Sequence, residues 1–212
     1  MPLHLQLISG DVMDKFLRFN FKDFCDRSAC ETDELFRVIQ PIRNGAWIAR
    51  GAIRRTLIRQ ALDSDFDFFF KSQEAMDEWA GKLPSTMKLV RETPHHKHWR
   101  GTLEGSELPI DVQAIRFRFY ESAEAVIDSF DYTVTMFALD GDTLVTTAEA
   151  LWDLGRKKLA IHKVTYPVAT LRRMLKYTRQ GFTVCGGCMA TLLRETAQNP
   201  EALSSLNIQY VD

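Results

Sequence analysis

The segment Ser64–Phe70, with the sequence SDFDFFF, constrains the fold of this 212-residue chain more than any other. Four of its seven residues are phenylalanine, and aromatic residues are enriched in strands, so the segment predicts a strand that enters a hydrophobic core. Asp65 and Asp67 stand within this aromatic run, two residues apart. Because residues two apart in a strand point to the same face, one face of the predicted strand carries both carboxylates.

The sequence around this segment alternates between strand and helix patterns. The predicted strands cover Ala46–Ala49, Lys88–Thr93, Trp99–Leu103 and Leu108–Phe119, and the predicted helices cover Ala52–Leu62 and Ser72–Lys82. Apolar spacing also suggests two short helices within residues 12–39. This order predicts an α/β or α+β fold in which helices flank a mixed sheet.

The chain becomes mainly helical in pattern after residue 120. We expect a helix over Glu121–Ser129, a strand over Thr133–Ala138, a turn at Asp140–Asp142 and a helix over Val168–Gln180. In the last helix, the residues expected on the apolar face are Leu171, Met174, Leu175 and Thr178, and those on the basic face are Arg172, Arg173, Lys176 and Arg179. We therefore predict a main domain over residues 1–150 and a small helical extension over residues 151–212.

Composition excludes several classes of protein. The chain has 27 basic and 28 acidic residues, a net charge of −1, which argues against a histone-like nucleic-acid binder but permits a local basic stripe. Its longest apolar runs are far shorter than the ~20 residues that a membrane helix needs. The first 16 residues show neither the cationic start nor the cleavage site of a secretory signal, so we predict a cytoplasmic protein.

A third acidic residue, Asp111, stands inside the otherwise apolar predicted strand that follows. Neighbouring carboxylates repel one another unless a cation lies between them, and paired divalent ions are the usual solution in phosphoryl transfer. Asp65, Asp67 and Asp111 are therefore the predicted catalytic and metal-binding residues. In the alternative interpretation, the first two cap strand ends and Asp111 forms a surface ion pair.

The residues before the acidic pair form a candidate phosphate-binding corner. Arg50 and Gly51 make a turn between the strand and the helix, and Arg54 and Arg55 follow in the helix. Backbone N–H groups at a helix start and guanidinium groups both bind phosphate, and glycine lets the backbone come close to it. Taken alone, Arg54 and Arg55 fit a solvated helix face better than a phosphate site.

Taken together, these motifs resemble the head domain of class II CCA-adding enzymes and bacterial poly(A) polymerases, in the polymerase-beta nucleotidyltransferase superfamily. The matching segments are Ala46–Arg55, Asp65–Asp67, Ile110–Val112, Phe130–Val134, Leu171–Tyr177 and Gly181–Phe182. The resemblance implies a catalytic domain over residues 1–150 with a polymerase-beta-like mixed sheet, and a neck-like extension over 151–212. Arg50 departs from the family pattern, because it stands where the first glycine would be.

The resemblance implies transfer of a nucleoside monophosphate from an NTP such as ATP to an acceptor hydroxyl, with release of pyrophosphate. Asp65, Asp67 and Asp111 would hold Mg²⁺ or Mn²⁺. The residues expected to bind the nucleotide are Arg50, Gly51, Arg54, Arg55, Asp131, Arg172, Arg173 and Lys176. An RNA 3′ end is the expected acceptor. The alternatives are a protein or small-molecule acceptor, an Asp-x-Asp glycosyltransferase, and a nucleotide-binding module without turnover.

Two further clusters could carry chemistry. Cys25, Cys30, Cys185 and Cys188 offer the four thiolates of a structural zinc site, although ordinary half-buried cysteines are the preferred interpretation. The three histidines of Pro94–Trp99 are expected in a loop or exposed strand, and Trp99 could stack on a base of the acceptor.

Overall fold

The computed structural model describes residues 15–28, 45–62, 65–102, 109–198 and 200. Eight strands from these residues form one mixed sheet in the order β1-β8-β7-β2-β3-β6-β5-β4. The strands are β1 (Phe16–Asn20), β2 (Ala46–Ala49), β3 (Phe66–Phe70), β4 (Lys88–Glu92), β5 (His96–Gly101), β6 (Ile110–Ile115), β7 (Ala138–Asp140) and β8 (Thr143–Thr147). A short parallel pair, β9 (Lys158–Leu159) and β10 (Thr183–Val184), lies apart from this sheet.

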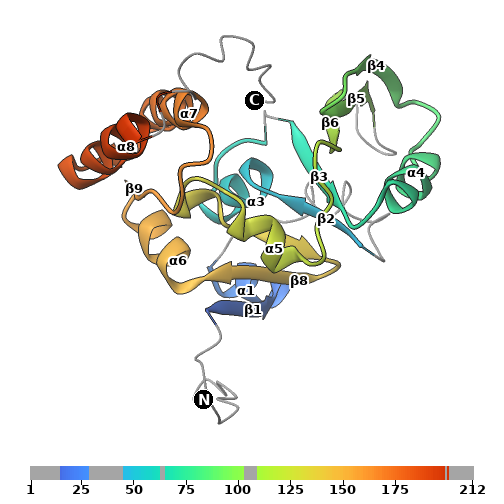
Figure 1. The fold of residues 1–212 in the computed structure, drawn as a ribbon. Helices are drawn as coiled ribbons and strands as arrows, with labels where there is room; N and C mark the ends of the chain where they lie inside the picture. The colour runs from blue at the N-terminus through green and yellow to red at the C-terminus, as the bar shows by residue number, and fades with distance from the viewer. Residues whose placement is uncertain (1–14, 29–44, 63–64, 103–108, 199, 201–212) are drawn as a thin grey trace.

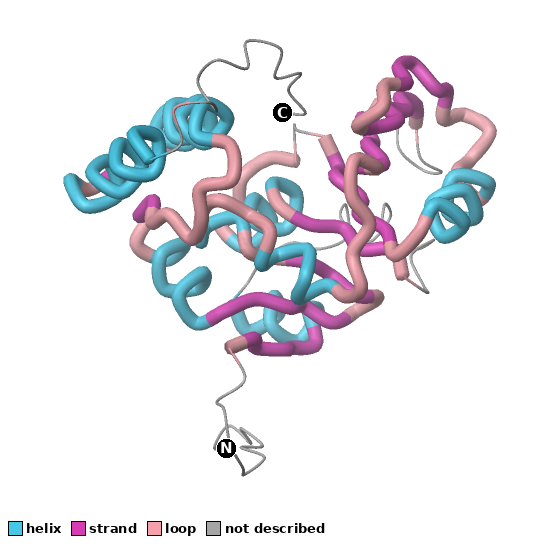
Figure 2. The backbone as a smooth tube through the Cα atoms, viewed as in Figure 1, coloured by secondary structure: helices cyan, strands magenta, loops and turns pink. Residues whose placement is uncertain are grey.

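Helices cover the sheet and extend beyond it (Figure 1). They are α1 (Phe21–Ser28), α3 (Gly51–Leu57), α4 (Gln73–Gly81), α5 (Ala123–Asp128), α6 (Ala148–Gly155), α7 (Pro167–Arg179) and α8 (Gly186–Gln198). Helix α5 packs against β2, β7 and β8, whereas α4 packs against β2 and β3. Figure 2 shows α7 and α8 on one side of the molecule and β4, β5 and β6 on the other. The predicted fold class is confirmed.

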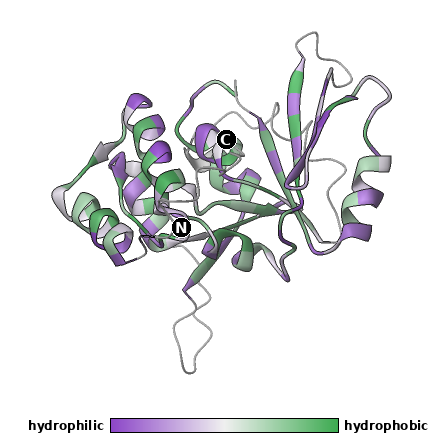
Figure 3. Ribbon diagram, turned by 45° about the horizontal axis from the view of Figure 1, so that its top comes forward, coloured by the Kyte–Doolittle hydropathy of each residue, from purple (hydrophilic) through white to green (hydrophobic). Residues whose placement is uncertain are grey.

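The aromatic segment is the centre of the core, as its composition predicts. All five residues of β3 are buried, and β3 lies between β2 and β6 in the sheet. Phe68 and Phe70 pack on Trp79 of α4, while Phe69 packs on Tyr120 and Phe130 on the opposite side. Figure 3 shows that the central strands are mostly hydrophobic, whereas the outer helices alternate hydrophobic and hydrophilic residues.

Three element predictions were wrong. Phe16–Asn20 is a strand at the sheet edge, paired with β8, where a helix had been expected. Residues Thr133–Thr135 form a single 3-10 turn (η1), and the strand begins later, at Ala138. The helix expected to reach Leu62 ends at Leu57, because Arg59 adopts a left-handed backbone (φ 55°) that a helix cannot continue.

The apolar face of α7 also differs from the prediction. Met174 and Tyr177 are buried, but Leu171 and Leu175 are exposed. The inner face of the helix is completed by Ala169 and Thr170, since α7 docks along a line rotated from the predicted one. Gly181 follows the helix with a positive φ of 88°, as expected of a C-terminal cap. The described helices include none long and apolar enough to cross a membrane.

Candidate active site

The three predicted carboxylates lie on two adjacent strands. Asp67 is in β3 and pairs in parallel register with Gln113 of β6. Asp65 stands two residues before Asp67, and Asp111 stands two residues before Gln113, so all four side chains belong to the same face of the two strands. The parallel register of β3 and β6 therefore brings Asp65 and Asp111 together.

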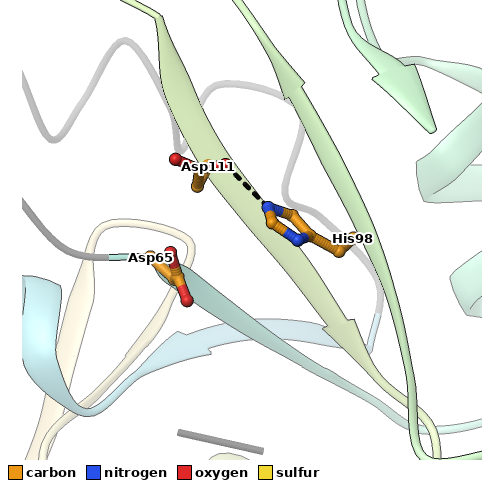
Figure 4. Close-up of side chains that lie close together, drawn as sticks. All are labelled: Asp65, His98 and Asp111. Carbon is orange, nitrogen blue, oxygen red and sulfur yellow. Dashed lines mark hydrogen bonds and ion pairs between the residues drawn. The ribbon is translucent and has the colours of Figure 1, made fainter. Parts of the chain in front are cut away.

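Asp65 and Asp111 lie close to His98 of β5. One ligand atom from each of these three residues lies within 4.8 Å of the others. Figure 4 shows the three side chains pointing toward one another, with the His98 imidazole directed at Asp111. Nε2 of His98 lies 2.7 Å from Oδ1 of Asp111, and Nη1 of Arg100 lies 3.9 Å from Oδ2 of the same carboxylate.

Gln113 holds Asp65 in place. Its Nε2 donates a hydrogen bond to Oδ2 of Asp65, while its Oε1 is buried without a hydrogen-bond partner among the described residues. Burial raises the pKa of Asp65 above its usual value, and the charge of Asp111 adds to this effect. His98 acts in the opposite direction and keeps the carboxylate closer to its ionised form.

Asp65, Asp67 and Asp111 lie on one face of β3 and β6 and are called the carboxylate row below. Asp67 is its most buried member. Only 7% of its surface is exposed, and burial raises its pKa to about 6 although the charge of Arg50 opposes this shift. Nη1 of Arg50 lies 3.7 Å from Oδ2 of Asp67. Oδ1 has no hydrogen-bond partner among the described residues. An unpaired buried carboxylate oxygen is costly, so it marks a place that a cation or a substrate group can fill.

Arg50 has a backbone conformation that glycine normally supplies. Its φ of 69° and ψ of −124° match the first central position of a type II′ turn. A side chain at such a position costs about 1–3 kcal/mol. The backbone is fixed there because Arg50 N donates to Phe137 O at 3.1 Å and Arg50 O accepts from Arg54 N at 3.1 Å. The side chain lies over two rings, with its guanidinium carbon 5.1 Å from the Phe69 centroid and 4.8 Å from the Phe130 centroid.

Gly51 differs from the expectation placed on it. It is the first residue of α3, and the positive φ in this turn belongs to Arg50. Arg50 stands where the family pattern has its first glycine, and Arg50 is also the residue of this turn with the strained backbone. A guanidinium beside Asp67 results from this replacement.

Arg54 and Arg55 make structural contacts. Arg54 is 2% exposed, so a solvated helix face is the wrong interpretation for it. Its Nη2 donates to Oε1 of Gln180 at 2.7 Å, and its guanidinium carbon lies 4.7 Å from the Tyr177 ring centroid. Arg55 donates from Nη1 to the carbonyl of Ala61 at 2.8 Å. These contacts tie α3 to the end of α7 and to the following loop, and the phosphate-binding role of Arg54 and Arg55 stays a prediction.

Helix α7 brings basic side chains to the carboxylate row. Arg173 donates from Nη1 to Oδ2 of Asp131 at 2.8 Å. Burial lowers the pKa of the Arg173 guanidinium, but the charge of Asp131 and its hydrogen bond outweigh burial, so the pKa is raised. Lys176 is exposed, and its charge acts on Asp65 and Asp67 to lower the pKa values that burial raises. Arg172 is exposed on the same helix.

The position of α7 is set by contacts with the core. The Tyr132 hydroxyl donates to the carbonyl of Thr170 at 2.9 Å, and the Tyr132 and Tyr177 rings pack edge to face. Together with the Arg54–Gln180 and Arg173–Asp131 hydrogen bonds, these contacts hold the helix at both ends and in the middle. Helix α7, which carries Arg173 and Lys176, is therefore anchored to the core.

These residues fit a divalent cation. Asp65, Asp111 and His98 supply two carboxylates and an imidazole at distances that one ion could bridge, and Asp67 adds an unpartnered buried oxygen nearby. Among the described residues, this is the one group of three potential ligands that converges. Carboxylate and imidazole groups are the usual ligands of divalent ions at open, catalytic sites.

Sequence reasoning missed His98 and Gln113. The histidine-rich segment was assigned to a loop or exposed strand, but β5 pairs antiparallel with β6 and places His98 beside Gln113 and Asp111. Gln113 follows Asp111 by two residues, which is the signal that would have placed it on the same face. Trp99 is 9% exposed and packs on Trp79, with ring centroids 5.7 Å apart, so the base-stacking role predicted for it was wrong.

The predicted zinc site receives no support from the described cysteines. Cys25 and Cys188 are buried and Cys185 is exposed, while Cys30 lies outside the described residues. Cys185 and Cys188 are at the start of α8, where the Cys188 amide donates to the Cys185 sulfur at 3.4 Å. Cys25 belongs to α1 and is packed in the core. The four-cysteine site, the less favoured interpretation of the sequence, is not tested because Cys30 lies outside the described residues.

Comparison with known proteins finds one family and one curated relative. A family model described as "Gabija anti-defense 2 family protein" matches residues 15–157. The protein "Gabija anti-defense 2" of Bacillus phage SPbetaL7 is 30% identical over 145 residues, which are 67% of this chain and 35% of the relative. The chain thus spans about a third of the length of that relative.

Comparison with solved structures finds CCA-adding enzymes. A complex of a CCA-adding enzyme with CTP matches with a TM-score of 0.61 at 14% identity, over 91% of this chain and 49% of that one. A Thermotoga maritima CCA-adding enzyme in complex with a tRNA matches with a TM-score of 0.58 at 16% identity, over 91% and 48%. The likeness covers about half of each enzyme. It confirms the predicted resemblance at the level of the fold.

Proposed function

This chain belongs to the Gabija anti-defense 2 family, and we propose that it is a metal-dependent nucleotidyltransferase. It would transfer a nucleoside monophosphate from an NTP to an acceptor hydroxyl and release pyrophosphate. One observation carries the proposal: Asp65 and Asp67 of one strand meet Asp111 of the next on a single face of the sheet, and basic residues of α7 stand near them. The fold in which they meet is that of CCA-adding enzymes.

The residues of the site divide the chemistry among them. The acceptor oxygen attacks the α-phosphorus, the bond to the bridging oxygen breaks, and pyrophosphate leaves with that electron pair. A carboxylate oxygen of Asp111, held by His98, accepts the proton of the hydroxyl. Lys176 and Arg173 neutralise charge on the phosphate oxygens. A divalent ion bound at Asp65 and Asp111 would add Lewis-acid polarisation of the α-phosphate.

We propose an RNA 3′ end as the acceptor. The solved relatives include a CCA-adding enzyme with CTP and one with a tRNA, so this fold accommodates both an NTP and an RNA in those proteins. The exposed side chains of Arg172 and Lys176 on α7 provide a basic surface next to the site. Such a surface suits a phosphate backbone.

The test is incubation of the full chain with each of four α-labelled NTPs, total cellular RNA, and Mg²⁺ or Mn²⁺. We expect label in RNA together with release of pyrophosphate. Label in protein or in small molecules would instead identify another acceptor class, and label in no fraction would contradict the proposed function.

A pair of variants ties the activity to the site. The double variant Asp65→Asn/Asp111→Asn should lose transfer, because it removes two of the three carboxylates without changing their size. The matched control is Asp140→Asn, an exposed aspartate at the β7 turn, which should transfer label like wild type. Equal transfer by the double variant would refute the assignment of this site.

The name of the phage relative suggests the biological setting. We propose that this chain also counteracts Gabija defence, with nucleotide transfer as its chemistry. Bacteria carrying Gabija should become sensitive to phage when they express the wild-type chain, and should stay protected when they express Asp65→Asn/Asp111→Asn. Equal sensitivity with both chains would separate the anti-defence role from the proposed chemistry.

A further inference from the structure

The acidic face already holds one fixed cation. The Arg50 guanidinium is seated between the Phe69 and Phe130 rings and lies 3.7 Å from Asp67. Its backbone is locked in a glycine-type conformation by the hydrogen bonds to Phe137 and Arg54. The side chain is largely buried, so it cannot swing into solvent without leaving both rings.

This position leaves little room for a second ion at Asp67. A divalent ion bound to Oδ2 would face the guanidinium at close range, in a buried environment where charges of like sign repel strongly. Oδ1 of Asp67 has no hydrogen-bond partner among the described residues, and the Asp67 and Asp65 side chains belong to the same face. Asp67 can thus share its two oxygens between Arg50 and one ion.

The remaining ligands differ from an all-carboxylate set. Asp65, Asp111 and His98 combine two oxygens with one imidazole nitrogen. Mg²⁺ prefers oxygen ligands and gives up its water shell reluctantly. Imidazole is instead a ligand of first-row transition metals, for which affinity rises from Mn²⁺ towards Cu²⁺ and Zn²⁺. The His98 side chain therefore favours a transition metal over Mg²⁺.

We infer that this site binds one divalent transition-metal ion through Asp65, His98 and Asp111, and that Arg50 takes at Asp67 the place of a second ion. The inference concerns the site of the proposed function and deepens it. Within that function, two positive charges would neutralise the triphosphate. One is the metal ion taken up from solution, and the other is the Arg50 guanidinium.

The test is a titration of the metal-free full chain with MnCl₂, followed by the electron paramagnetic resonance signal of unbound Mn²⁺. We expect one Mn²⁺ per chain, and displacement by Mg²⁺ only at concentrations at least tenfold higher. Two bound Mn²⁺ per wild-type chain, or displacement by equal concentrations of Mg²⁺, would overturn the inference.

Two histidine variants test the ligand set. His98→Gln should weaken Mn²⁺ binding at least tenfold and change Mg²⁺ binding less than threefold. His95→Gln is the matched control, because His95 is exposed in the turn before β5 and lies outside the ligand group. It should bind Mn²⁺ like wild type. Unchanged Mn²⁺ affinity in His98→Gln would exclude this residue as a ligand.

The Arg50→Gly variant tests the second half of the inference. Glycine suits the φ and ψ of this position, so the variant should fold, and circular dichroism checks that it does. We expect two Mn²⁺ per chain, since the fixed cation is gone. Arg50→Asn, which also tolerates a positive φ, is a second form of the same test. One Mn²⁺ per chain in both folded variants would contradict the role given to Arg50.

The metal titration and the transfer assay can fail separately. Nucleotide transfer with two ions bound would keep the proposed function and overturn this inference. One bound Mn²⁺ without transfer to any acceptor would keep the inference and contradict the proposed function.

Discussion

The two ends of the carboxylate row are built differently. At the inner end, Asp67 is buried in β3 and its charge is balanced by Arg50, a residue of the same chain held under strain. At the outer end, Asp65 and Asp111 are half-buried and meet the imidazole of His98. The inner end is an internal ion pair, whereas the outer end has ligand atoms to offer. The comparison shows that carboxylates on one face can have distinct roles when their counterions differ.

The largest difference should appear when the outer end is changed. Asp65→Asn keeps the hydrogen bond from Gln113 but removes a negative charge that binding of the proposed divalent ion needs. We expect nucleotide transfer to fall about a thousandfold, or ~4 kcal/mol, with the free energy of unfolding changed by less than about 0.5 kcal/mol. Single-turnover transfer and urea unfolding measure the two quantities. A loss of activity that merely followed a loss of stability would erase the distinction between the two ends.

A substitution at the inner end, at Asp67, should change the free energy of unfolding of the protein. Burial raises the pKa of Asp67 from 3.8 to about 6, so the ionised carboxylate opposes folding at neutral pH. Asp67→Asn should therefore stabilise the metal-free protein by up to about 3 kcal/mol at pH 7.5. Urea unfolding in the presence of a chelator measures this difference, and a destabilised variant would show that the Arg50 pair outweighs the desolvation of Asp67.

The same variant makes a prediction about pH. Between pH 3.8 and about 6, the folded wild-type protein keeps a proton on Asp67 that the unfolded chain releases, so its stability falls as the pH rises through this window. The advantage of Asp67→Asn should consequently be complete above pH 6 and vanish near pH 4. An advantage that does not depend on pH would have another cause than the charge of Asp67.

We expect the smallest effect from a substitution in α7, at Lys176, whose charge acts on both Asp65 and Asp67. Lys176 acts on the carboxylates through its charge without a hydrogen bond to them. Lys176→Gln should slow transfer about tenfold, or ~1.4 kcal/mol, and leave stability unchanged, because the side chain is exposed. Arg179→Gln, an exposed change one turn later in the helix, is the control and should transfer like wild type. Equal effects of the two variants would point to the overall charge of α7 instead of the position of Lys176.

Much of the fold could be predicted because its signals are local. The alternation of Asp65 and Asp67 with phenylalanine marks both the strand and the face of the carboxylates. The edge strand β1 was missed because its pattern over five residues, Phe16–Asn20, also fits a helix turn. The strand expected at Thr133 was wrong because the Thr135 hydroxyl donates to the Tyr132 carbonyl three residues earlier and stabilises a turn, while the Thr133 hydroxyl donates to Asp153 of α6.

The arginines show where local signals end. Arg50, Arg54 and Arg55 stand within six residues and carried the same prediction, yet one pairs with Asp67, one is buried against Tyr177 and one closes a loop. No spacing within α3 distinguishes these outcomes. The outcome for Arg54 depends on where α7 docks, because its hydrogen bond to Gln180 joins residues 126 positions apart in the chain.

By itself, the sequence determined the strand and helix order around the acidic pair, the shared face of Asp65 and Asp67, and the neighbouring strand that carries Asp111. These features follow from backbone periodicity, which a short segment expresses on its own. Only the tertiary structure decided that His98 completes the outer end, that Arg50 closes the inner end, and that Lys176 faces both. The physical reason is that the counterion of a carboxylate is chosen by sheet order and helix docking, which join segments that have no local relation in the chain.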